Sequence, residues 1–150
     1  MPELPEDDRS IDGSDRCYRR IPPSQAPYNE NRGRRWPSSG NLTPSKEDTE
    51  VSIYLGSVLD ELHLLPEDVL EGHEGYGLSC FPAQAARDAN FGIKRDPVTE
   101  SNRPLKVDPA HAVLTGLPPT GKPAIKRARK LVYDERLIVV REPDAPEDLP

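Results

Sequence analysis

Residues 116–122 (GLPPTGK) have the spacing of a phosphate-binding loop and fall between a predicted strand and a predicted helix. In such loops the residue after the lysine is Ser or Thr, whose hydroxyl binds magnesium. Here that residue is Pro123, which has neither a hydroxyl nor a backbone amide, and two further prolines remove amides from the loop itself. The sequence therefore favours a proline-stiffened turn into a helix over a nucleotide site.

Metal binding and cysteine catalysis both need clustered side chains. The histidines and cysteines show none of the paired spacings of zinc sites; they are His63, His73, His111, Cys17 and Cys80. Cys80 could pair with His73 or His111 as nucleophile and base, but a cysteine in an apolar run is more often a packing residue. His111 lies in an apolar predicted strand, where a hydrogen-bonded core histidine is the favoured interpretation. We expect no metal.

Basic side chains gather in two segments, one around the single tryptophan and one on a predicted helix that begins near Pro123. Arginine and tryptophan are the residue types that anchor interfaces. The predicted partner-binding residues are therefore Arg32, Arg34, Arg35, Trp36, Lys126, Arg127 and Lys130. The alternatives for the helix are a solvated face, or pairing with the acidic ends of the same chain.

Five short features follow one another within residues 17–61: arginines at 19 and 20, GRRW at 33–36, SSG at 38–40, VSIYL at 51–55 and a glutamate at 61. This order resembles the start of the RES-type toxins, whose fold is similar to ADP-ribosyltransferases and which consume NAD. The resemblance implies that Arg19 grips a diphosphate, that Tyr54 lines the same pocket and that Glu61 stabilises positive charge on ribose. An ordinary strand, loop and strand is the alternative interpretation.

Three further segments resemble a group of small uncharacterised bacterial proteins. They are residues 18–23 (YRRIPP), 35–39 (RWPSS) and 108–112 (DPAHA). This second resemblance extends over most of the chain and brings no activity with it. It implies a bacterial, intracellular protein.

The elements that must position these residues alternate along the chain. Period-two patterns and short apolar runs predict strands at 17–21, 51–55, 76–81, 110–115 and 137–140. Helices are predicted from Ser57, at 66–71, at 82–89 and from Pro123, the last with Ile125 inward and Arg127 outward. This order predicts an α+β fold: one small domain with a mixed sheet of about five strands and three to four short helices.

Composition divides the chain into three parts. Residues 1–15 form a predicted disordered acidic segment, residues 16–141 the domain, with a long loop at 22–50, and residues 142–150 a flexible acidic tail. The net charge of -6 makes nucleic acid an improbable partner. Two separated cysteines, no long apolar stretch and a polar beginning predict a soluble, cytoplasmic protein without a membrane segment.

Two functions from different classes follow. The first is a binding or accessory protein that recognises another protein through the Arg/Trp-rich loop and the basic helix, without a cofactor. The alternative is an NAD-consuming enzyme with Arg19, Tyr54 and Glu61 in its pocket. The first requires an exposed Trp36, and the second requires that its three side chains share one cleft.

Overall fold

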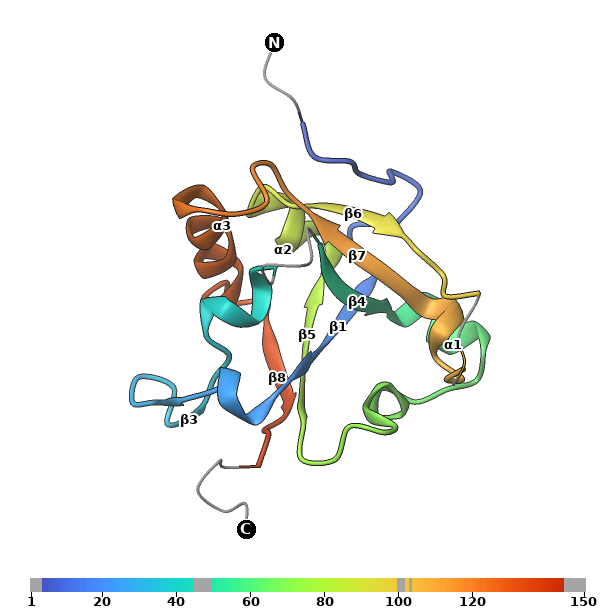
Figure 1. Ribbon diagram of the computed structural model, residues 1–150, viewed down its shortest axis with the longest axis horizontal. Helices are drawn as coiled ribbons and strands as arrows, with labels where there is room; N and C mark the ends of the chain where they lie inside the picture. The colour runs from blue at the N-terminus through green and yellow to red at the C-terminus, as the bar shows by residue number, and fades with distance from the viewer. Residues whose placement is uncertain (1–3, 45–49, 100–101, 103, 145–150) are drawn as a thin grey trace.

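The fold is centred on one antiparallel sheet (Figure 1). The structure is a computed structural model that describes residues 4–44, 50–99, 102 and 104–144. Within these ranges six strands form the main sheet in the order β6-β7-β4-β1-β5-β8, and neighbouring strands are antiparallel. Their bounds are β1 Arg16–Ile21, β4 Val51–Leu55, β5 Gly77–Pro82, β6 Gly92–Arg95, β7 His111–Thr115 and β8 Ile138–Arg141. A hairpin of β2 (Tyr28–Asn29) and β3 (Arg34–Arg35) forms a second, two-stranded sheet.

Short helices cover this sheet. In the described part of the chain they are α1 (Gly56–Glu61), α2 (Ala83–Asp88), α3 (Lys122–Val132) and the 3₁₀ turns η1 (Pro23–Gln25), η2 (Ser39–Leu42), η3 (Pro66–Leu70) and η4 (Asp108–Ala110). The predicted single α+β domain is confirmed. Where the sequence predicts about five strands in a mixed sheet, the sheet has a sixth strand, β6, and its pairings are antiparallel. No helix among the described residues is long and apolar enough to cross a bilayer.

Strand alternation gives the sheet two buried faces, each with its own core. Cys17, Ile53 and Phe81 point to the face covered by α2 and α3. Tyr18 and Tyr54, which pair across β1 and β4, point to the opposite face, where α1, η3 and η4 cover them. Figure 1 shows β1, β4 and β5 in the middle of the sheet, with α3 at one side of the molecule and α1 at the other.

The Arg/Trp segment folds back onto the domain, which corrects the prediction of an exposed binding loop. Trp36 is only 6% exposed, and its indole Nε1 donates to the carbonyl oxygen of Val132 at 2.9 Å. Val132 is the last residue of α3, where helix carbonyls lack intrahelical donors, so the indole completes this helix end. The predicted loop at 22–50 therefore contains the β2–β3 hairpin and two 3₁₀ turns, and residues 45–49 lie outside the described residues.

The acidic N-terminal segment is also ordered where the structure describes it, from residue 4 onward, although the sequence predicts disorder for residues 1–15. The Asp8 amide donates to the Ile93 carbonyl at 2.7 Å, and Ile11 is buried. Glu6 pairs with Lys94 at 2.9 Å. The physical reason is that β6 is an edge strand with unpaired backbone groups and two cations, which an acidic extended segment can satisfy. We call residues 4–15 the N-terminal arm.

The beginning of the predicted flexible C-terminal tail is held as well. Pro143 is buried, and the amide of Asp144 donates to the Gly75 carbonyl at 2.8 Å. Glu142 accepts the Arg35 amide at 2.7 Å. Residues 142–144, at the start of the tail that is predicted to be flexible, thus have partners in the hairpin and in the turn before β5, and residues 145–150 lie outside the described residues.

Replacement of Trp36 tests this docking of the hairpin. Trp36→Ala removes a buried indole and its hydrogen bond, and we expect the free energy of unfolding to fall by about 3–5 kcal/mol. Urea denaturation followed by circular dichroism measures it. The control is Tyr28→Ala in the same hairpin, because Tyr28 is 66% exposed and its loss should change stability by less than about 0.5 kcal/mol. Equal stability of the two variants would contradict the burial of the indole.

The two cysteines provide a second test. Both are free and buried, and burial raises the pKa of each thiol. Because the thiolate is the reactive form, neither cysteine should react with Ellman's reagent at pH 8 in the folded protein, and both should react after unfolding in guanidinium. Rapid reaction of the folded protein would show that the sheet around Cys17 and Cys80 is open.

Candidate functional site

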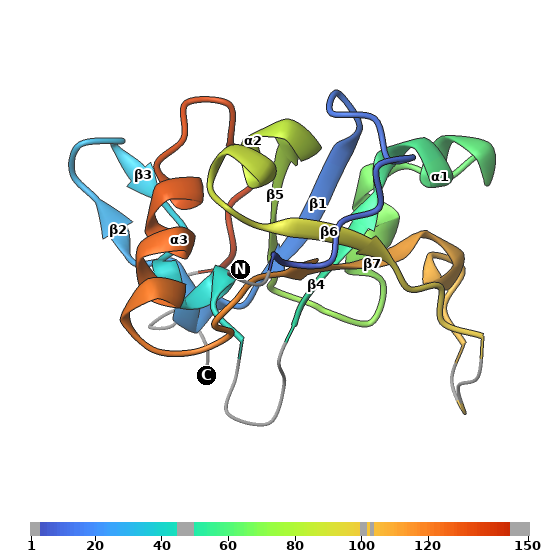
Figure 2. The ribbon, with the colours of Figure 1, turned by 90° about the horizontal axis from the view of Figure 1, so that it is seen from above.

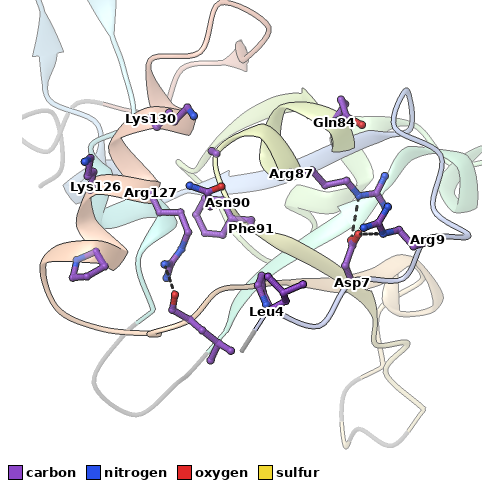
Figure 3. Close-up of a pocket in the computed structure, with 14 residues that line it drawn as sticks. Leu4, Asp7, Arg9, Gln84, Arg87, Asn90, Phe91, Lys126, Arg127 and Lys130 are labelled. Atoms are coloured by element: carbon purple, nitrogen blue, oxygen red, sulfur yellow. Dashed lines mark hydrogen bonds and ion pairs between the residues drawn. The ribbon is translucent and has the colours of Figure 1, made fainter. Parts of the chain in front are cut away.

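A groove of about 850 Å³ lies between α3, α2 and the N-terminal arm (Figure 3). Its volume is within the range of ligand sites. Five basic side chains and one acidic side chain line it: Arg9, Arg87, Lys126, Arg127, Lys130 and Asp7. The amide side chains of Gln84 and Asn90 and several apolar residues, among them Leu4 and Leu117, line the remainder. In Figure 3 the basic residues of α3 lie on one side and those of α2 and the arm on the other.

The spacing of α3 explains how it presents these cations. Ala124, Arg127, Ala128 and Leu131 are buried, which is the i, i+3, i+4, i+7 stripe of an amphipathic helix. Two predictions about this helix are therefore wrong: Arg127 points inward and is 8% exposed, whereas Ile125 points outward and is 40% exposed. Sequence spacing is compatible with burial of either of two adjacent faces of this helix. In the folded protein the buried face is the one that contains Arg127.

Arg127 is held by the turn that enters α3. Its guanidinium donates to the carbonyl oxygens of Leu117 at 3.2 Å and Pro118 at 2.6 Å, and Cζ lies 5.4 Å from the centre of the Phe91 ring. Burial lowers the pKa of this guanidinium. The side chain fits because residue 116 is glycine: a Cβ there would overlap Arg127 Nε. The GLPPTGK segment thus uses carbonyl oxygens to hold an arginine.

The two walls of the groove differ in how their charges are compensated. Asp7 pairs with both Arg87 and Arg9, each at 3.1 Å, and its carboxylate also accepts the Ile93 amide at 3.1 Å. On the α3 wall, Lys126 and Lys130 are exposed, and neither forms an ion pair with a carboxylate of residues 4–44, 50–99, 102 or 104–144. The positive potential of the groove is therefore strongest along α3.

The predicted partner-binding residues separate into two groups. Lys126, Arg127 and Lys130 lie together in the groove. The residues of the Arg/Trp segment lie elsewhere, in a hairpin that Figure 2 shows beside α3, and Trp36 faces the interior. The sequence gives no sign of Arg87, Asn90 and Phe91 as lining residues, because α2 and the turn after it are distant from α3 in the chain.

The arginines of the hairpin have partners within the protein. Arg35 donates from Nε to the Ala26 carbonyl and from Nη2 to the Pro23 carbonyl, both at 2.6 Å. Arg34 Nε lies 3.7 Å from Glu142 Oε1. Arg32 is exposed, and its guanidinium carbon stacks 4.4 Å from the Trp36 ring centre. These contacts hold the hairpin against the rest of the domain.

The residues of the enzyme alternative do not share a cleft. Arg19 points to the same face as Cys17, and its guanidinium donates to the carbonyls of Asn41 and Ser52, each at 2.9 Å. Burial, together with the neighbouring Arg20, lowers the pKa of Arg19 to about 10. Tyr54 lies in the core of the opposite face, and Glu61 is exposed at the end of α1. The convergence that an NAD pocket needs is therefore absent for these described residues.

The N-terminal arm forms one wall of the groove, and Gly92 lets it approach β6. A Cβ at position 92 would overlap the carbonyl oxygen of Glu6. We expect Gly92→Ala to displace the arm, to lower the free energy of unfolding by about 1–3 kcal/mol and to remove hydrogen-exchange protection from the Asp8 amide. The control is Gly40→Ala, where the nearest atom would be Ser38 Oγ at 3.5 Å. Retained protection of Asp8 in Gly92→Ala would exclude this docking of the arm.

No known protein family, curated protein or solved structure matches this chain. The two resemblances read from the sequence therefore stay predictions.

Proposed function

We propose that this chain is a binding protein that captures an acidic, partly apolar segment of another protein in the groove beside α3. The observation that carries the proposal is the pair Lys126 and Lys130, exposed on one helix wall and without an ion-pair partner among the described residues. Four residues apart, they lie one helical turn from each other on the same face. Two carboxylates of an extended segment could contact them together.

The surroundings favour such a ligand. The chain as a whole carries a net charge of -6, so a basic groove is a local exception that attracts and orients an acidic partner. Leu4 and Leu117, which are exposed, add apolar surface to the groove, where aliphatic side chains of the partner gain contact area. A long nucleic acid is disfavoured, because its continuous phosphates would also meet the acidic remainder of the surface.

The opposite wall supports the same function. Arg9 and Arg87 already share Asp7, which lies on the N-terminal arm, and the acidic arm contacts β6 next to the groove. An acidic segment of this chain is thus bound at one side of the groove. A second acidic segment, from a partner, would satisfy the basic side chains that remain on α3.

Charge reversal on α3 tests the proposal. We expect a fluorescein-labelled peptide of alternating glutamate and leucine to bind the wild type, with fluorescence anisotropy as the measurement. The double variant Lys126→Glu, Lys130→Glu should lose at least about tenfold in affinity, which corresponds to about 1.4 kcal/mol. Salt of about 1 M should also weaken binding, because the screening length falls to about 3 Å.

The matched control is Lys122→Glu, Arg129→Glu, which makes the same charge change on the same helix at exposed residues outside the groove. It should bind the peptide within about threefold of the wild type, since screening at physiological salt limits exposed charges beyond about 8 Å. Equal loss in both double variants would show attraction by net charge alone, and no loss in either would show that α3 is not the binding wall. Either result would refute the proposal.

A further inference from the structure

A serine, a histidine and an aspartate lie in line at the β4–β7–β6 edge of the sheet. His111 Nε2 is 3.0 Å from Ser52 Oγ, and His111 Nδ1 is 2.7 Å from the carbonyl oxygen of Asp96 and 3.3 Å from its carboxylate Oδ2. These groups come from three separate chain segments and lie outside the groove. We propose that Ser52 is an acyl-accepting nucleophile, with His111 as its base, in a site that hydrolyses small carboxylic esters.

The hydrogen bonds fix the histidine tautomer that the chemistry needs. The Asp96 carbonyl can only accept, so Nδ1 of His111 carries the proton that is donated to it. In the neutral ring Nε2 is then the bare nitrogen, and it accepts the hydroxyl proton of Ser52. A nucleophile bonded to a base that a third group orients is the arrangement of serine hydrolases.

The sheet holds these groups rigidly. Ser52 is on β4 and His111 on β7, adjacent strands in which Tyr54 pairs with His111 and Ser52 with Val113. Asp96 follows β6, and its amide donates to the His111 carbonyl at 3.0 Å, which keeps it beside the ring. The Tyr54 ring packs edge-on against the imidazole at a centroid distance of 5.5 Å. Asp96 is a positioning residue, whereas Ser52 and His111 would touch the reacting atoms.

Arg20 adds a cation to the same face. Tyr18 pairs with Tyr54, so the antiparallel register places Arg20, two residues on, across from Ser52. Its guanidinium lies over the Tyr54 ring at 4.7 Å and donates from Nε to the Val69 carbonyl at 2.6 Å, whereas Nη2 is buried without a hydrogen-bond partner among the described residues. A positive charge on the face that carries Ser52 and His111 favours the negative charge that forms on a carbonyl oxygen when its carbon is attacked.

The reaction needs no further reactant besides water. Ser52 Oγ bonds to the carbonyl carbon while its proton moves to His111 Nε2. The ester C–O bond then breaks, and Nε2 returns the proton to the departing alcohol. Water attacks the acyl-serine through the same base, which releases a carboxylic acid and restores the hydroxyl. Ser52 is half-buried and the His111 side chain is 12% exposed, so the acyl group must be small.

A phosphonofluoridate probe tests the nucleophile directly, since Ser52 Oγ would bond to phosphorus as fluoride leaves. Intact-protein and peptide mass spectrometry of the full chain should show one adduct, on Ser52. Ser52→Ala should abolish it. Ser57→Ala is the matched control: Ser57 is also half-buried but bonds to Asp15 at 2.5 Å instead of to a histidine, and its removal should leave labelling unchanged.

The base is tested by rescue. His111→Ala should slow labelling of Ser52, and hydrolysis of p-nitrophenyl acetate, by at least about a hundredfold, and added imidazole should restore part of both rates. A purely structural histidine would not give this rescue. Absence of a Ser52 adduct in the folded wild type, or hydrolysis that persists in Ser52→Ala, would overturn the proposal. Peptide binding in the α3 groove is independent of both results.

Discussion

The register of β1 between β4 and β5 is the constraint on which the rest of the molecule depends. Cys17 pairs with Leu55 and Phe81, and Tyr18 pairs with Tyr54 and Cys80, so both sides of β1 are hydrogen-bonded. A slip of one residue would exchange the two faces. This register sends Arg19 to the face of α2 and α3 and sends Arg20 to the opposite face. It separates Arg19 from Tyr54, and it brings Arg20 to the side of Ser52 and His111.

Arginine side chains donate hydrogen bonds to main-chain carbonyl oxygens in the irregular segments of this fold. Arg19 bonds to the carbonyls of Asn41 and Ser52, Arg35 to those of Ala26 and Pro23, and Arg127 to those of Leu117 and Pro118. Proline-rich turns supply few amide donors, whereas a guanidinium carries five donors in a fixed fork. A high arginine content in such segments is therefore as much a feature of internal structure as of recognition.

The distribution of charge decides which cations remain for a partner. The acidic arm brings Glu6, Asp7 and Asp8 to Lys94, Arg87 and Arg95 along β6 and α2. The exposed Lys126 and Lys130 of α3 form no ion pair with Glu6, Asp7 or Asp8. An acidic chain thus retains one basic wall, along α3. The groove and the pair of Ser52 and His111 lie in different parts of the molecule, so the proposed binding and the proposed catalysis would be independent of each other.

The sequence determined the α+β class, the approximate position of most strands and helices, the two free buried cysteines and the basic character of α3. Local patterns suffice for these, because alternation, proline placement and helix spacing are properties of short segments. The residue types alone also predicted a partner-binding surface at Arg32, Arg34, Arg35 and Trp36.

Tertiary structure alone decided where those residues point. Trp36 is buried because the end of α3, almost a hundred residues away, offers a free carbonyl. The arm is ordered because β6 presents an unpaired edge, and Arg127 turns inward because Gly116 leaves space for it. Ser52, Asp96 and His111 give no local signal, since their approach depends on the pairing of strands that are far apart in the chain. Contacts of this kind follow from register and packing, which no short stretch of sequence specifies.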